Sequence, residues 1–170
     1  MDPSAPSDYH SAPPARPHVW LAEPREAPDV ARLLVAFRDH LGFDWPSDAS
    51  FRASVERLMD DEATEYLLGA AQPGAPAGGV VQLRYRWAVW RDSYDCLLED
   101  LFVAPEARRG GLGRALVAET IERARARGCR RIELDTAETN TAARALYESM
   151  GFDDGAYEGG RSLFLRRRLD

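Results

Sequence analysis

The sequence predicts an α/β (α+β) fold in which a mixed, mostly antiparallel sheet of seven strands carries helices on both faces. The spacing of apolar residues changes repeatedly between the helical and the strand period, in the order β-α-α-β-β-β-α-β-α-β-β. Three of these strands follow one another directly, which is typical of an antiparallel meander. A strand, a helix and a strand near Val103, Leu116 and Ile132 then form one right-handed crossover.

The composition predicts a single domain, over residues 18–170. The chain of 170 residues is 45% hydrophobic and 29% charged, which suffices for one buried core. A net charge of -6 argues against nucleic-acid binding, and the complete absence of lysine excludes lysine-dependent chemistry. Cys96 and Cys129 are too few for a disulfide framework and lack the spacing of a zinc site, so no metal is expected. No apolar run reaches the ~18 residues of a membrane span and no apolar leader is present, so we expect a cytoplasmic protein.

The N-terminal part holds a tail, a strand and two helices. Residues 1–17 are rich in proline among Ser, Ala and Asp, and we expect them to be disordered. A strand at Val19–Ala22 precedes a helix that begins near Pro28 and ends before Gly42, and a second helix spans Phe51–Met59. The apolar positions of the first helix are Val30, Leu33, Leu34, Phe37 and Leu41, and the candidate caps of the second are Ser47, Asp48 and Ser50.

The middle of the chain consists of strands. Two turn-forming segments, Pro73–Pro76 and Arg91–Ser93, separate them. The three strands are Tyr66–Ala71, Gly79–Trp90 and Tyr94–Val103. The elements that follow are a helix between Pro105 and Gly128, a strand at Arg131–Asp135, a helix that ends at Gly151, and closing strands at Phe152–Tyr157 and Ser162–Leu169.

A Gly/Arg-rich turn, Arg108–Gly113, leads into the third helix and is a candidate anion site, because backbone N–H groups at a helix N-terminus lack partners. A P-loop would need a lysine, which the chain does not contain. A dinucleotide fingerprint would need a small residue where Leu116 stands. A flexible surface loop is the remaining alternative for the turn taken alone.

Two motifs together resemble the GCN5-related N-acetyltransferase family. The first is Arg108-x-x-Gly111-x-Gly113 after a strand that ends Leu-Phe-Val-Ala-Pro; the second is Asn140 followed seven residues later by Tyr147, before Met-Gly-Phe. The resemblance covers nearly all of the chain after the tail. It implies N-acetyltransferase activity, a sheet whose fourth and fifth strands splay apart, and acetyl-CoA as a co-substrate in the gap.

The resemblance also implies the residues that hold acetyl-CoA. Amides of the turn would bind the pyrophosphate, and the backbone of Leu101 and Val103 would pair with the pantetheine arm like an extra strand. Asn140 would contact the cofactor or cap its helix, and Arg109 stands where the family often has glycine. The expected contacts are Leu101, Phe102, Val103, Arg108, Arg109, Gly110, Gly111, Leu112, Gly113, Arg114, Asn140 and Ala143.

Three residues are candidates for catalysis. Tyr147 lies on the apolar face of its helix and could be a core aromatic, but its position matches the family's proton donor to the departing CoA thiolate. Glu99 and Asp100 stand in an order similar to that of the diamine (spermidine/spermine) acetyltransferase branch, where the first carboxylate binds the amine. We expect Glu99 to take this role, with Asp100 second, because adjacent strand residues point to opposite faces. Both could also be ordinary charges at a sheet end.

The acceptor is expected to be a small-molecule primary amine, polyamine or amino-acid-like, that is acetylated by direct transfer. Aromatic and acidic side chains suit a cation, and the expected contacts are Asp39, His40, Trp45, Tyr85 and Trp87. His40 has no metal-ligand spacing, and the tryptophans could instead serve core or dimer packing. A protein acetyltransferase acting on lysine or an N-terminus, and a non-catalytic acyl-CoA-binding module, are the alternatives. Family members are often dimers, and nothing in the sequence decides between a monomer and a homodimer.

Overall fold

The computed structural model describes residues 16–155, 160, 165–167 and 169. The tail expected over residues 1–17 therefore lies almost entirely outside the described residues, and so do residues 156, 157, 162–164 and 168 of the closing strands expected at Phe152–Tyr157 and Ser162–Leu169. The described part contains five strands rather than the expected seven, and its residues 152–155 form none.

The sheet is mixed, as predicted. Its strands lie in the order β1-β2-β3-β4-β5; the first four form an antiparallel meander and β5 runs parallel to β4. The right-handed crossover of the sequence prediction corresponds to β4, α3 and β5. The strand bounds are His18–Leu21 (β1), Thr64–Ala70 (β2), Gly79–Ala88 (β3), Ser93–Val103 (β4) and Arg131–Glu133 (β5).

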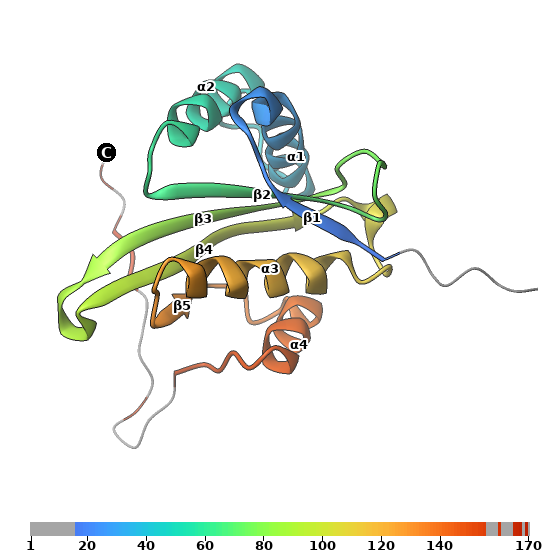
Figure 1. Ribbon diagram of the computed structural model, residues 1–170. Helices are drawn as coiled ribbons and strands as arrows, with labels where there is room; N and C mark the ends of the chain where they lie inside the picture. Colours follow the sequence, from blue (N-terminus) through green and yellow to red (C-terminus); the bar gives the residue numbers. More distant parts are fainter. Residues whose placement is uncertain (1–15, 156–159, 161–164, 168, 170) are drawn as a thin grey trace, which may run out of the picture.

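Helices cover both faces of the sheet. Two of them, α1 and α2, lie on one face, whereas α3 and α4 lie on the other (Figure 1). Each side has its own apolar core, one centred on α1 and β2, the other on α3 and the central strands. The helix bounds are Ala27–His40 (α1), Asp48–Met59 (α2), Leu112–Ala126 (α3) and Thr141–Ser149 (α4).

Polar side chains begin two of these helices. Of the three candidate caps of α2, Ser47 is the one whose side chain accepts from the Ser50 amide. Asn140 caps α4, with its Oδ1 3.3 Å from the amide nitrogen of Ala143. Gly111 precedes α3 with a φ of 81°, a conformation that glycine adopts without a Cβ penalty.

Two glycines let α3 approach the sheet closely. Gly69 of β2 and Gly79 of β3 are cross-strand partners. A Cβ on Gly69 would lie 2.8 Å from Cδ1 of Leu112, and one on Gly79 would lie 2.8 Å from Cδ1 of Leu116. Both leucines are fully buried in the first turns of α3. The pair of glycines therefore sets the height of the helix N-terminus above the sheet.

A β-bulge interrupts β4. Gln82 pairs with Asp100 but the next residue of β3, Leu83, pairs with Leu98, so Glu99 has no partner. Leu98 and Leu101 both pack into the core beneath α3, which leaves Glu99 and Asp100 together on the face of α1 and α2. The expectation that the two carboxylates point to opposite faces is therefore wrong, because it assumed uninterrupted alternation.

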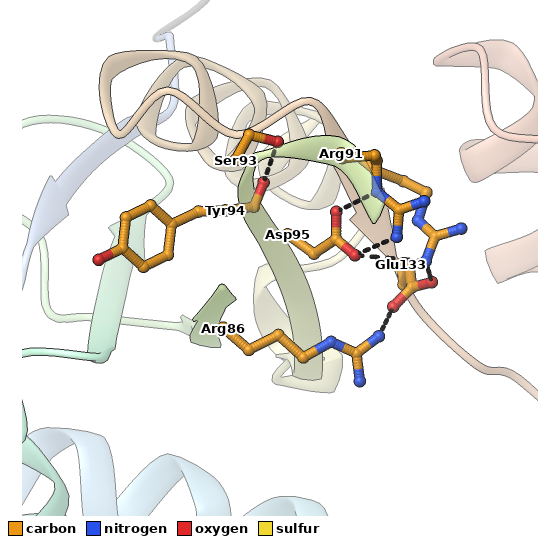
Figure 2. A network of polar contacts seen from close by, with 7 residues as sticks. Arg86, Arg91, Ser93, Tyr94, Asp95 and Glu133 are labelled. Atoms are coloured by element: carbon orange, nitrogen blue, oxygen red, sulfur yellow. Dashed lines mark hydrogen bonds and ion pairs between the residues drawn. The ribbon is translucent and has the colours of Figure 1, made fainter. Parts of the chain in front are cut away.

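An ionic network surrounds the short contact between β4 and β5. Asp95 is 1% exposed and accepts from Nε of Arg91 at 2.8 Å and from Arg131 at 3.3 Å (Figure 2). Glu133 of β5 binds both Arg131 and Arg86 of β3. The network thereby links β3, β4 and β5 at the place where the last two strands still pair.

No helix of the described residues has the length and apolar character needed to cross a membrane. Within the same residues, no group of three or more His, Cys, Asp and Glu side chains gathers in a way that could hold a metal ion.

Candidate active site

The edge of β4 is open beyond its contact with β5. The two strands pair only through Asp95–Leu97 of β4 and Arg131–Glu133 of β5, whereas β4 runs on to Val103. From Leu98 onward no described strand pairs with this edge, so the backbone groups that point to it, apart from the Val103 carbonyl that accepts from Arg108, are available to an extended ligand. This is the divergence of the fourth and fifth strands that the resemblance implied.

The last three residues of β4 alternate between the two cores. Leu101 and Val103 are half-buried against the apolar core beneath α3. Phe102 is buried on the other side, where its ring stacks on Phe37 of α1 with centroids 5.3 Å apart. The side chains of these residues therefore fix the strand, and only its backbone edge can serve a ligand.

The turn between β4 and α3 presents free amide groups. In the part of the chain that the structure describes, the N–H groups of residues 109–114 donate to no backbone carbonyl. A Cβ on Gly110 would meet nothing within 4 Å, and one on Gly113 would lie 3.5 Å from Leu146. Leu112 anchors the turn because its side chain is 1% exposed. Free N–H groups and the helix dipole together favour an anion such as a phosphate at this position.

The three arginines of the turn have different environments. Arg108 turns back to β4, where its Nε donates to the Val103 carbonyl at 2.9 Å. Arg114 reaches α4 and donates to Oγ of Ser149 at 2.7 Å. Arg109 forms no hydrogen bond or ion pair with a described residue and has a φ of 66°, a conformation unusual for any residue but glycine. Of the three side chains, Arg109 is thus the one that is free to contact a ligand.

Tyr147 projects from α4 into the core beneath α3. It is 8% exposed, its ring centroid lies 5.7 Å from that of Phe152, and its hydroxyl bonds to no described residue. Burial raises the pKa of its phenol, so the group keeps its proton at neutral pH. Asn140 and half-buried Ala143 form the first turn of the same helix. Both ends of the second motif therefore belong to one rigid element.

The two carboxylates of the bulge differ in their partners. Glu99 accepts from Nε2 of Gln82 at 2.8 Å and lies 3.9 Å from the Arg84 guanidinium. Asp100 is half-buried and has neither a hydrogen bond nor an ion pair among the described residues. Burial, with the neighbouring charges of Glu99 and Asp135, raises the pKa of Asp100 to about 6. Asp100 is therefore a carboxylate without a counter-ion.

Three polar residues near Asp100 were not anticipated from the sequence. Tyr66, Gln82 and Arg84 lie on the same face of the sheet as Asp100. Among the described residues, the Tyr66 hydroxyl and Nε of Arg84 are buried and have no hydrogen-bond partner. A strand in which polar and apolar residues alternate signals one polar face. Only the register between strands shows that these side chains come together at Asp100.

The segment that runs from the last turn of α1 into the loop before α2 contributes little contact to this region. Asp39 is engaged by Nε of Arg38 at 2.9 Å. His40 lies near the Phe102 ring and 3.4 Å from the Arg108 guanidinium, beside the turn rather than in a metal site. Trp45 is 78% exposed. Of the three expected acceptor contacts in this segment, His40, the last residue of α1, is the one that lies against β4.

The structure does not bring Tyr85 and Trp87 to the face of Asp100. Both point to the side of α3, because they alternate with Arg84 and Arg86 along β3. Tyr85 is buried and donates to Glu65 at 2.9 Å, and Trp87 packs against Tyr94 at the end of the β3–β4 hairpin. The prediction that they line the acceptor site is therefore wrong, because the sequence alone did not show which face of the sheet these aromatic side chains occupy.

Comparison with known families agrees with this geometry. A family model described as Acetyltransferase (GNAT) family matches residues 30–152, which include the open edge of β4, the turn and α4. The chain belongs to this family. It is an N-acetyltransferase, and its co-substrate is acetyl-CoA.

Relatives of this acetyltransferase act on different amines. It is 30% identical over 147 residues to the thialysine N-epsilon-acetyltransferase of Bos taurus, covering 80% of this chain and 85% of that protein. It is 28% identical to the aminoglycoside N(6')-acetyltransferase type 1 of Salmonella typhimurium, over 72% and 82% of the two chains. The crystal structure of a protein from Arthrobacter sp. FB24 matches this fold with a TM-score of 0.78. The two sequences are 29% identical, and the match covers 99% of this chain and 100% of that one. Aminoglycoside N-acetyltransferase AAC(6')-Iy in complex with CoA shares the fold, with a TM-score of 0.70 at 22% identity over 91% and 97%.

The residues of the acetyltransferase fit acetyl-CoA. The free amides of residues 109–114 suit its diphosphate, and the open edge of β4 suits its amide-containing arm. Gly110 leaves room for a close approach of the backbone. When bound there, the co-substrate supplies an activated acetyl group as a thioester.

Proposed function

We propose that this acetyltransferase transfers the acetyl group directly to the primary amine of a small, cationic acceptor, a polyamine or an amino-acid-like amine. The observation that carries the proposal is Asp100, a half-buried carboxylate next to the open edge of β4 that has no counter-ion among the described residues. A carboxylate in such a place attracts an ammonium group more strongly than one on the surface. Relatives named for thialysine and for aminoglycosides also act on small amines.

Asp100 would bind the ammonium group and take one proton from it, directly or through water. A primary amine with a pKa of about 10.4 must lose that proton before its nitrogen can attack a carbonyl. The pKa of Asp100, raised to about 6, leaves most of the carboxylate ionised at neutral pH and brings it nearer to that of the amine. Glu99, which the sequence analysis ranked first, already binds Gln82 and would serve as a second negative charge.

Tyr147 would donate a proton to the sulfur as the carbon–sulfur bond breaks and the amide bond forms. A buried phenol that retains its proton at neutral pH is suited to this role. Asn140, which caps α4, and the free amides of the turn would hold the co-substrate in place.

Direct transfer agrees with the state of the two cysteines, the thiols that could carry an acetyl group. Cys96 is 0% exposed, and burial raises its pKa to about 12. Burial also raises the pKa of Cys129. Since the thiolate is the nucleophile, neither residue is suited to form an acyl-enzyme.

The experiment is release of free CoA thiol with a panel of small amines, comparing the wild type with Asp100→Asn. We expect activity with at least one diamine or amino-acid-like amine, and a loss of about 100-fold in kcat/KM in the variant, within the range that general-base catalysis contributes. Glu122→Gln, which alters an exposed ion pair of α3, is the control. Thiol release only with peptides would favour a protein acceptor, and CoA binding without thiol release under any condition would favour a binding module.

A further inference from the structure

A polar row crosses three strands beneath α1 and α2. Tyr66 of β2 stands opposite Gln82 of β3, and Gln82 stands opposite Asp100 of β4. Cross-strand partners lie on the same face of a sheet, about 5 Å apart, so the Cα atoms of Tyr66 and Asp100 are about 10 Å apart. Burial and, after it, the charge of Asp100 raise the pKa of the Tyr66 phenol, so the two side chains lie near each other.

The Tyr66 hydroxyl is a buried donor without an acceptor. Tyr66 is 2% exposed, and its hydroxyl has no hydrogen-bond partner among the described residues. Buried polar groups are rarely left in this state, because the unmade bond carries a desolvation penalty. The Gln82 amide between the two residues already donates to Glu99. Among the described residues, the Tyr66 phenol is therefore a hydrogen-bond donor without an acceptor, and the Asp100 carboxylate in the same row is an acceptor without a donor.

The charged groups around Asp100 do not stabilise its negative charge. Glu99 lies beside it on β4, and Asp135 follows β5; both are negative and disfavour ionisation. Arg84 of β3 is shared between Glu99 at 3.9 Å and Asp61, which follows α2, at 3.6 Å. From α1, His40 lies one row away, against Phe102. No described cation is paired with Asp100.

We propose that Tyr66 is a positioning residue of the acceptor site: its hydroxyl, which is not bonded to Asp100 in this structure, turns to donate to the ionised Asp100 carboxylate and holds it charged and oriented for an ammonium group. A hydrogen bond to the charged form of an acid favours that form. The site would therefore select amines that arrive as cations over neutral nucleophiles. This inference rests on the proposed function, in which Asp100 binds the amine.

The test is Tyr66→Phe, which removes the hydroxyl and keeps the ring. We expect the acid limb of kcat/KM for the best amine to move upward by about one pH unit, so that KM rises about tenfold near pH 5 but only about twofold at pH 7. The value of kcat at alkaline pH and the affinity for CoA should stay the same. Tyr94→Phe removes a half-exposed phenol at the other end of β4 and should change none of these quantities.

A second readout does not need an active acceptor. The pKa of Asp100 can be followed by carbon NMR of the labelled carboxyl group, and it should be about one unit higher in Tyr66→Phe than in the wild type. The kinetic effect of Tyr66→Phe should also disappear in an Asp100→Asn background. An unchanged carboxyl titration, or an equal kinetic effect in both backgrounds, overturns the role of Tyr66. Absence of thiol release with every amine would instead refute the proposed function and leave the titration to decide on Tyr66.

Discussion

Arg109 combines an unfavourable backbone conformation with a free, charged side chain. Its φ of 66° lies in the left-handed region, which costs a non-glycine residue about 1–2 kcal/mol. Its guanidinium has no described partner, unlike those of Arg108 and Arg114. The structure thus gives a physical reason for the glycine that the family often has at this position, and the free guanidinium beside the proposed diphosphate site is a reason to retain an arginine.

The Arg109→Gly variant should therefore unfold at a higher temperature but bind CoA several-fold more weakly. Relief of the backbone strain is expected to add about 1 kcal/mol to the free energy of unfolding, measured by thermal denaturation. Calorimetric titration with CoA measures the lost charge. In Arg109→Ala the charge is lost and the strain remains, so affinity should fall without the gain in stability. Equal affinity of all three proteins would contradict a contact between Arg109 and the diphosphate.

Tyr147→Phe tests the proton donor. Turnover should fall at least about tenfold, as is usual on loss of a general acid, while the affinity for CoA stays near that of the wild type. The ring remains packed against Phe152, so thermal stability should change little. Turnover equal to that of the wild type would assign Tyr147 to the core alone, the alternative that its position on the apolar face of α4 leaves open.

At the scale of elements, the contact between α3 and the sheet links packing to co-substrate binding. A Cβ on Gly79 would lie 2.8 Å from Leu116 Cδ1 and 3.4 Å from the Phe102 carbonyl oxygen. In Gly79→Ala, the buried Leu116 side chain must therefore give way, and we expect α3 to shift with it, at a cost of about 1–3 kcal/mol typical of overpacked cores. The free amides at the N-terminus of α3 move with it, so CoA affinity should fall as well.

Combining Gly79→Ala with Leu116→Ala provides the control. The smaller side chain removes the clash, so the loss of unfolding free energy in the double variant should be less than the sum of the two single losses, as measured by denaturant titration. Strict additivity would show that the helix does not press on this glycine.

Most elements could be predicted because their signals are local. Pro28 and Gly42 bracket α1, and Asn140 begins α4 where the motif placed it. β5 is shorter than the expected Arg131–Asp135, because a strand ends where its partner diverges and the sequence of one strand carries no such information. The bulge at Glu99 was invisible for a similar reason: one extra residue shifts the pairing but leaves the composition of the strand unchanged.

The parts of the candidate site that consist of residues close together in the sequence could be predicted from motifs. The turn, Asn140 and Tyr147 are such cases, and their roles in catalysis and binding remain predictions. The polar row of Tyr66, Gln82 and Asp100 joins three strands, and the placement of Tyr85 on the opposite face depends on the alternation of β3. Register across a sheet is decided by packing of the whole domain, so pattern reasoning along one segment could not find it.

For the whole molecule, two buried carboxylates predict sensitivity to acid. Burial opposes ionisation of Glu65, but bonds from Arg123, Tyr85 and Arg127 outweigh it and hold the pKa of Glu65 below its ordinary value. The bond from Arg91 likewise lowers the pKa of Asp95. A carboxyl group whose pKa is lower in the folded state contributes stability above its unfolded pKa and loses it as pH falls through the folded pKa. The melting temperature should therefore drop as pH is lowered from about 5 to below 4.

Ionisation of Asp100 has the opposite effect on the stability of the fold. Its pKa is raised in the folded state to about 6, so its ionisation destabilises the fold as pH rises from about 4 through 6. Asp100→Asn should thus melt at a higher temperature than the wild type at pH 8, and the difference should disappear near pH 4. A variant equally stable at both pH values would contradict an uncompensated charge at this position. Asp61→Asn, whose carboxylate has a lowered pKa, should show the reverse trend.

Because Glu99 is an extra, unpaired residue, the residues of β4 that face α3 have even numbers before it and odd numbers after it. Before it, even-numbered residues such as Cys96 and Leu98 face α3; after it, the even-numbered Asp100 and Phe102 face α1, while Leu101 and Val103 take over the core beneath α3. Deleting this one residue would restore uninterrupted pairing with β3 and would leave Leu101 and Val103 toward α3 and Phe102 toward α1. The extra residue thus leaves the faces of its neighbours unchanged and adds a second carboxylate to the wall of the proposed acceptor site.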